Sequence, residues 1–135
     1  MAAAYHLQIV SLDGLVYDGD AVCLSVRGQD GNLSVLAGHT NFCTAIGMGE
    51  ARVVLADGTE RTAACIGGML SVMDGAARLI ATTWEWKEDI DVGRAEAAKK
   101  EAEERLAQND LSEREYRIAK AKLMRALVRI DAGQG

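Results

Sequence analysis

The chain has 135 residues, of which 20 are acidic and 15 basic, and its formal net charge is −5. This length suits one ordinary domain, or a small domain with an appendage, and the acidic balance argues against nucleic acid as a partner. The longest uncharged run, residues 33–49, is interrupted by glycines, His39 and Asn41, which excludes a transmembrane helix.

The cysteines and the first residues indicate a compartment. Cys23, Cys43 and Cys65 are odd in number and form no Cys-x-x-Cys pair, which fits neither a disulfide framework nor a zinc site and is typical of a reducing environment. The first six residues lack a basic segment and an apolar stretch, so no secretory signal is predicted. We expect a soluble, cytosolic protein without a metal.

Residues 1–84 alternate short apolar segments with turn signals. Apolar alternation at residues 21–26, 52–55, 69–73 and 78–81 predicts strands. Aspartate followed by glycine favours tight hairpin turns, because glycine tolerates positive φ. Five such pairs begin at Asp13, Asp18, Asp30, Asp57 and Asp74. This part of the chain therefore predicts an antiparallel β-sandwich.

The composition changes between Trp84 and Asp91. Eleven of the 14 glycines lie at or before Gly75, whereas 23 of the 35 charged residues lie in residues 85–131. Alanine and charged residues in such density favour helix. We predict a domain boundary here, with a β-sandwich over residues 1–84 and a helical domain over residues 85–135.

The helical domain predicts two antiparallel helices joined by a short loop. The first helix, over residues 91–108, presents a small apolar face made of Ala95, Ala98, Ala102 and Leu106. Ser112 and Glu115 form a capping box that opens the second helix. That helix is expected to end before Gly133, with an apolar stripe at Tyr116, Ala119, Leu123, Leu127 and Ile130. The predicted fold class is α+β, an N-terminal antiparallel β-sandwich followed by a C-terminal antiparallel two-helix hairpin.

No catalytic constellation is evident. The two histidines, His6 and His39, are far apart, and the sequence contains neither Gly-x-Ser-x-Gly, nor Gly-x-x-x-x-Gly-Lys, nor a cluster with metal-ligand spacing. We interpret the chain as non-enzymatic, and His39 as a loop histidine with a structural hydrogen bond.

The arginines of the second helix allow two interpretations. Arg125 and Arg129 are four residues apart and share a helix face, and Arg94 should approach them where the hairpin opens onto the β domain. Three guanidinium groups held in this way suit a polyphosphate, and Asp91 beside them can accept a hydrogen bond from an adenine amino group. Alternatively, the arginines form surface ion pairs with Glu85, Glu88 or Asp91.

Five segments in register resemble the epsilon subunit of rotary F-type ATP synthases. They are residues 11–19 (SLDGLVYDG), 33–39 (LSVLAGH), 67–72 (GGMLSV), 88–95 (EDIDVGRA) and 123–130 (LMRALVRI). The resemblance implies a non-catalytic rotor subunit, held at the cytoplasmic face of the bacterial plasma membrane only through its complex. It implies that the sandwich binds the gamma subunit and the c-ring, and that the hairpin restrains ATP hydrolysis through the alpha and beta subunits. In the extended hairpin, the basic residues Arg117, Lys120, Lys122, Arg125 and Arg129 would then face acidic surface on those subunits.

The resemblance also implies a regulatory ATP site, although no cofactor is required. Some bacterial members bind ATP through an Ile/Leu-Asp-x-x-Arg-Ala motif, which here is Ile90, Asp91, Arg94 and Ala95. Glu85, Arg125 and Arg129 would complete most of that site. Glu101 stands where similar ATP-binding members carry an arginine, Gly93 weakens the helix, and Ala37 replaces a usual proline. We therefore expect ATP to bind weakly.

The partner surface is expected in the uncharged residues 33–49, at Leu36, Gly38, His39 and Phe42. Two further functions stay open from the residues alone. One is a stand-alone ligand-binding β-sandwich, for example for carbohydrate, and the other is an adaptor whose hairpin pairs with partner helices.

Overall fold

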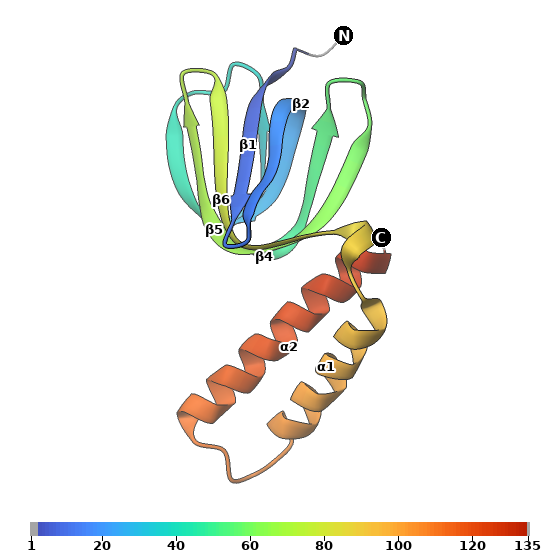
Figure 1. Ribbon diagram of the computed structural model, residues 1–135. Coiled ribbons are helices and arrows are strands. Elements are labelled where there is room, and N and C mark those ends of the chain that lie inside the picture. The colour runs from blue at the N-terminus through green and yellow to red at the C-terminus, as the bar shows by residue number, and fades with distance from the viewer. Residues whose placement is uncertain (1–2, 135) are drawn as a thin grey trace.

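The computed structural model describes residues 3–134 and contains a β-sandwich followed by two helices (Figure 1). The strands are β1 (Tyr5–Ser11), β2 (Gly14–Gly28), β3 (Gly31–Leu36), β4 (Phe42–Leu55), β5 (Glu60–Met73) and β6 (Ala76–Trp86). A 3-10 turn, η1 (Lys87–Asp89), leads to α1 (Val92–Leu106) and α2 (Glu113–Gln134). The predicted α+β class is confirmed. The prediction of no secretory signal concerns residues 1–6, of which Met1 and Ala2 lie outside the described residues.

The six strands form one sheet in the order β1-β6-β5-β4-β2-β3, and a further pairing between β1 and β2 closes it. Neighbouring pairs are antiparallel, as predicted, except that β1 and β6 run parallel, with Leu7 opposite Ala77 and Ile9 opposite Leu79. The exception has a geometric cause. The closed ring contains β1, β2, β4, β5 and β6, and a ring with an odd number of strands cannot alternate direction throughout.

The core lies between the two inner faces of the sandwich and comes from strands alone. Alternate residues point inward, as in Tyr5, Leu7 and Ile9 of β1, which are all buried. Tyr5 also donates a hydrogen bond of 2.8 Å from its hydroxyl to the carbonyl oxygen of Val35, and burial raises the pKa of this phenol above its ordinary value. The β-sandwich therefore has a complete core without help from the helices.

Four of the five predicted Asp-Gly turns are confirmed. Their glycines have positive φ angles of 116°, 125°, 89° and 83° at Gly14, Gly31, Gly58 and Gly75. The prediction at Asp18-Gly19 is wrong, because both residues lie inside β2, paired with β1. Gly19 instead leaves room for the Tyr17 ring, whose hydroxyl would lie 3.0 Å from a Cβ there and donates a 2.7 Å hydrogen bond to the Asp20 carbonyl oxygen.

The capping box that opens α2 is confirmed in both directions. The Ser112 hydroxyl oxygen accepts the Glu115 N–H at 3.1 Å, and the Glu115 carboxylate accepts the Ser112 N–H at 3.2 Å. These bonds contribute to the lowered pKa of Glu115. The sequence pattern therefore located the start of this helix correctly.

The predicted apolar stripe of α2 is only partly correct. The buried residues of α2 are Ala119, Ala126 and Ala132, whereas Tyr116 is 47% exposed. Small side chains are favoured at this seam because α1 also presents buried alanines, Ala95 and Ala102, across it. The helix also continues through Gly133, beyond its predicted end.

The hairpin projects from one end of the sandwich (Figure 1), and α2, rather than α1, packs against β4 and β5. β6 ends at Trp86, two residues past the predicted boundary at residue 84. The connection from β6 through η1 to α1 thus places the start of the hairpin directly beside the end of the sandwich.

Candidate ligand groove between the sandwich and the hairpin

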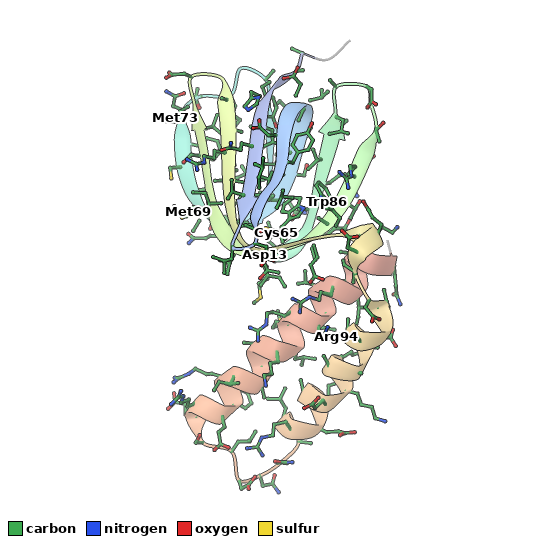
Figure 2. The ribbon with its side chains drawn as sticks, viewed as in Figure 1. Asp13, Cys65, Met69, Met73, Trp86 and Arg94 are labelled. Carbon is green, nitrogen blue, oxygen red and sulfur yellow. The ribbon has the colours of Figure 1, made fainter. Side chains whose placement is uncertain are left out.

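A groove of about 1000 Å³ runs along the facing sides of α1 and α2 and reaches the end of the sandwich. The junction between the sandwich and the hairpin lies at one end of this groove. Asp13, from the turn between β1 and β2, lies on its sandwich side, and Arg94 lies on α1 (Figure 2). The end of β6 contributes Thr83, Trp84 and Glu85. The groove is therefore built from segments that are distant in the sequence.

The structure brings almost all of the predicted ATP-site residues to this groove. Its lining includes Glu85, Asp91, Arg94, Ala95, Arg125 and Arg129. Ile90 is not part of the lining. Its side chain packs instead against the end of α2, where a Cβ on Gly133 would lie 3.2 Å from the Ile90 Cγ2.

Asp91 has a structural role that sets the start of α1. It is the N-cap residue, with extended backbone angles, and its Oδ1 accepts the Arg94 N–H at 3.0 Å. This capping bond occupies one oxygen of the carboxylate and places Arg94 in the first turn of the helix. The Ile-Asp-x-x-Arg-Ala string thus doubles as a helix-start signal.

The ion pairs agree in part with the second interpretation of the arginines. The Arg129 guanidinium binds the Glu85 carboxylate through its Nε. Glu88 pairs with Arg61 of β5 at 2.6 Å, rather than with a helix arginine, and this guanidinium holds the pKa of Glu88 below its ordinary value. Arg94 and Arg125 take part in no ion pair among the described residues.

The charge balance of the groove does not favour a highly charged anion. Seven carboxylate side chains line it, including Glu101. The five cationic side chains are Arg94, Arg105, Lys122, Arg125 and Arg129, and two of them, Arg105 and Arg129, are already bound to carboxylates. The cations free to meet a phosphate are therefore Arg94, Lys122 and Arg125.

Sequence reasoning missed several lining residues, notably Asp13, Thr83, Trp84 and Lys122. Trp84 is 8% exposed, and its buried indole Nε1 has no hydrogen-bond partner among residues 3–134. Lys122 could have been found from its spacing, since it precedes Arg125 by three residues on the helix. The contribution of Asp13 depends on the tertiary fold and has no local signal.

The predicted partner residues form a separate surface. Leu36 is 56% exposed at the end of β3, and Gly38 adopts a φ of 81° in the turn that follows. The His39 Nδ1 lies 3.0 Å from the Thr40 carbonyl oxygen, the loop hydrogen bond expected of this histidine. The Phe42 ring lies 4.8 Å from the His39 ring and packs against the core.

A second group of exposed apolar side chains lies on β5 and β6. Met69 and Ile80 are cross-strand neighbours on β5 and β6, and both are about half exposed, at 46% and 49%. Met69 and Met73 lie along one outer flank of the sandwich (Figure 2), and Met73 is 56% exposed. The sequence pattern predicted these strands, but it did not predict which face of each strand would be exposed.

Comparison with known proteins decides the family. Residues 4–87 match the family described as ATP synthase, delta/epsilon chain, beta-sandwich domain, and residues 88–134 match the delta/epsilon chain long alpha-helix domain. An ATP synthase epsilon chain of Ruminiclostridium cellulolyticum is 35% identical over 130 residues, which cover 96% of each chain.

The chain belongs to the epsilon-chain family of F-type ATP synthases.

Other members of the epsilon-chain family are similarly close. The epsilon chain of Lacticaseibacillus casei is 36% identical over 130 residues, covering 93% of this chain and 91% of that protein. The fold also matches a chain in the mitochondrial ATP synthase structure of Euglena gracilis, with a TM-score of 0.85 and 20% identity over 100% of this chain and 84% of that one. A chain from the Tetrahymena thermophila mitochondrial ATP synthase structure gives a TM-score of 0.70 at 9% identity, covering 98% of each chain.

These matches give no support to a stand-alone carbohydrate-binding sandwich or to a free adaptor. Within residues 3–134, neither helix combines the length and apolar character needed to cross a membrane.

Proposed function

We propose that the chain is the non-catalytic epsilon subunit of the rotating central stalk, where it joins the gamma subunit to the c-ring and couples ion translocation to ATP synthesis. The observation that carries this proposal is the match, in order and over both domains, to bacterial epsilon chains of nearly equal length. We place it at the cytoplasmic face of the plasma membrane, held there through the complex.

The chemistry of the groove supports a non-catalytic role. Among its lining residues there is no histidine, serine or cysteine that could act as nucleophile or general base near neutral pH. The lining consists largely of carboxylates, guanidinium groups and alanines. Such a groove can bind a ligand or a partner segment, but it offers no activated nucleophile.

The gamma subunit is proposed to bind the exposed apolar flank of the sandwich. Met69 and Ile80 lie side by side across the β5–β6 ladder, and exposed apolar surface of this kind is typical of protein interfaces. Leu36 offers a smaller exposed contact in the predicted turn, whereas Phe42 packs against the core. A charged group on the flank would be desolvated by the partner and would weaken binding.

The experiment is co-assembly with the gamma subunit. Met69→Lys with Ile80→Lys should reduce capture of the gamma subunit by about tenfold or more. Leu36→Lys tests the predicted turn separately. Ile118→Lys on α2, where the side chain is 46% exposed, is the matched control and should leave capture unchanged. Full capture by the Met69 and Ile80 variant would exclude this flank as the interface.

The hairpin is proposed to restrain ATP hydrolysis by contacting acidic surface on the alpha and beta subunits. Arg117 and Lys120 are exposed on α2, and Arg117 has only a 3.5 Å surface contact with Glu113. In an assembled enzyme, removal of residues 88–135 should raise ATP hydrolysis and leave ATP synthesis intact. Equal hydrolysis with and without the hairpin would remove this regulatory role.

A weak regulatory ATP site in the groove is the last part of the proposal. The lining has the expected residue types for the adenine amino group, at Asp91, and for phosphates, at Arg94 and Arg125. The seven carboxylates oppose this binding, so a low affinity is expected.

A further inference from the structure

The hairpin is attached to the sandwich by a thin interface. Every residue of the main core cluster comes from a strand, and every fully buried helix residue is an alanine. α2 packs against β4 and β5, and its partly buried Leu127 and Val128 line a hollow together with residues of β4. Apolar burial therefore contributes little to docking, and polar contacts carry more weight than in an ordinary domain interface.

Two ion pairs lie at this junction, one on each side of the chain connection. Glu85, at the end of β6, binds Arg129 of α2. Three residues later, Glu88 in η1 binds Arg61 of β5 at 2.6 Å. The Arg61 guanidinium also lies 3.7 Å from the ring centroid of Trp86, which fixes its position. The first pair therefore joins the end of β6 to α2, and the second joins the 3-10 turn between β6 and α1 to β5.

We propose that the Glu85–Arg129 and Arg61–Glu88 pairs form a clasp that holds the hairpin in its docked position, and that loss of the clasp frees a folded hairpin from a folded sandwich. This inference deepens the proposed regulatory role of the hairpin. It is a property of the isolated chain, so its failure can be told apart from failure of that role in the assembled enzyme.

The exposure of the pairs sets the size of the effect. The side chains of Glu85 and Arg129 are 32% and 31% exposed, and those of Arg61 and Glu88 are 33% and 58% exposed. A partly exposed ion pair shifts an equilibrium by about two- to fivefold. The two pairs together therefore change docking by about tenfold, and salt weakens both because charges near solvent are screened.

The chain contains its own reporter of docking. Trp84 and Trp86 are its only two tryptophans, and both lie at the junction, with ring centroids 5.2 Å apart. Trp84 is buried at the end of the groove. Trp84 belongs to the sandwich core but also lines the groove, so release of the hairpin would open one side of it to solvent. We expect its emission to shift to longer wavelength and its quenching by acrylamide to increase, both less than on unfolding of the sandwich.

The test compares Glu85→Gln, Glu88→Gln and their double variant with the wild type, by tryptophan emission and far-ultraviolet circular dichroism. We expect the double variant to increase acrylamide quenching with helical and strand signals unchanged. We also expect salt to increase quenching in the wild type, where it screens both pairs, and to have less effect in the double variant. The control is Asp18→Asn, which removes a 2.7 Å contact with His6 between β1 and β2, and neither residue lines a pocket against the helices.

A second set of variants tests whether the effect comes from the ion pair itself rather than from the loss of either side chain. Exchanging the charges, Glu85→Arg with Arg129→Glu, should restore the wild-type emission that Arg129→Glu alone disturbs. Unchanged quenching in the double glutamine variant would overturn the clasp. So would an equal change in the Asp18→Asn control, or a loss of helical signal accompanying the change in emission.

Discussion

Glu101 and Arg125 lie at the same level of the hairpin. The two helices are antiparallel, and a Cβ on Gly133 would lie 2.6 Å from the Val92 Cγ2, so Val92 and Gly133 are opposite each other. Glu101 is nine residues beyond Val92 on α1, which sets it opposite the residue nine before Gly133, next to Arg125. Both line the groove, and the carboxylate therefore offsets a cation that a phosphate would need.

Replacing this carboxylate should strengthen ATP binding. At an effective dielectric near 20, two unit charges about 6 Å apart interact by roughly 3 kcal/mol before screening, so Glu101→Arg should increase affinity about tenfold or more. Glu101→Gln, which removes only the repulsion, should give a smaller gain. Titration calorimetry measures both, with Arg125→Ala as the variant expected to lose binding. Equal affinities for wild type and Glu101→Arg would mean that ATP does not bind in this groove.

At this scale, the residue types of the groove could be predicted from the sequence more reliably than the partners of those residues. The spacing of Arg125 and Arg129 placed both on the groove side of α2, as expected from helix geometry. It could not reveal that Glu85 would bind Arg129 while Glu88 turned to Arg61. These partners depend on the path of the chain through the end of β6 and the 3-10 turn, which orients the carboxylates of Glu85 and Glu88 differently. No local sequence pattern predicts that orientation.

Two glycines of the hairpin have opposite consequences for its stability. Gly93 lies in the first turn of α1, where a Cβ would meet only the Asp91 Oδ1 at 3.5 Å, an ordinary contact. Gly133 lies in the last turn of α2, where a Cβ would come within 2.6 Å of the Val92 Cγ2. At Gly93 a methyl group would fit without a clash. At Gly133 the absence of a side chain allows the end of α2 to pack closely against the start of α1.

The expected effects of alanine at the two positions therefore differ in sign. Gly93→Ala should stabilise the hairpin by about 0.5–1 kcal/mol through helix propensity. Gly133→Ala gains a similar amount of propensity but forces the stiff Val92 side chain to move, an overpacking cost of about 1–3 kcal/mol, so a net loss is expected.

Thermal unfolding followed by the helical circular dichroism signal measures both variants against the wild type. A higher melting temperature for Gly133→Ala would contradict the close packing of α2 against the start of α1.

The helices show what periodicity can and cannot predict. The capping box fixed the start of α2, because its two hydrogen bonds are local. The predicted apolar stripe was wrong at Tyr116, which is exposed, because the sequence does not show which element packs against a given helix face. Here the neighbour is an alanine-lined helix, so Ala119 and Ala126 take the seam and the larger side chains lie to its sides. The turn predicted at Asp18-Gly19 was wrong for a related reason. Pairing with a neighbouring strand, which a local pattern does not reveal, places both residues inside β2.

The whole molecule consists of a sandwich with its own core and a helical hairpin docked at one end of it. We predict that residues 1–87 alone fold cooperatively and retain a β-type circular dichroism spectrum, because the main core cluster contains no helix residue. Residues 88–135 alone should retain a helical signal, because α1 and α2 pack against each other through a seam of buried alanines. Denaturant unfolding of each fragment tests this. An unfolded sandwich fragment beside a stable full chain would show that the hairpin completes the core.

The parallel pairing of β1 with β6 has a consequence for synthesis on the ribosome. Leu7 is opposite Ala77 in that pair, so the first strand to emerge must wait until about 70 further residues have been translated before one of its edges is covered. Contacts so distant along the chain form slowly, and until then β1 can pair only with β2, through the hairpin at Gly14. The two helices are local and follow last. We therefore expect the ring to close late in the folding of the sandwich, and the hairpin to dock onto a sandwich that is already complete.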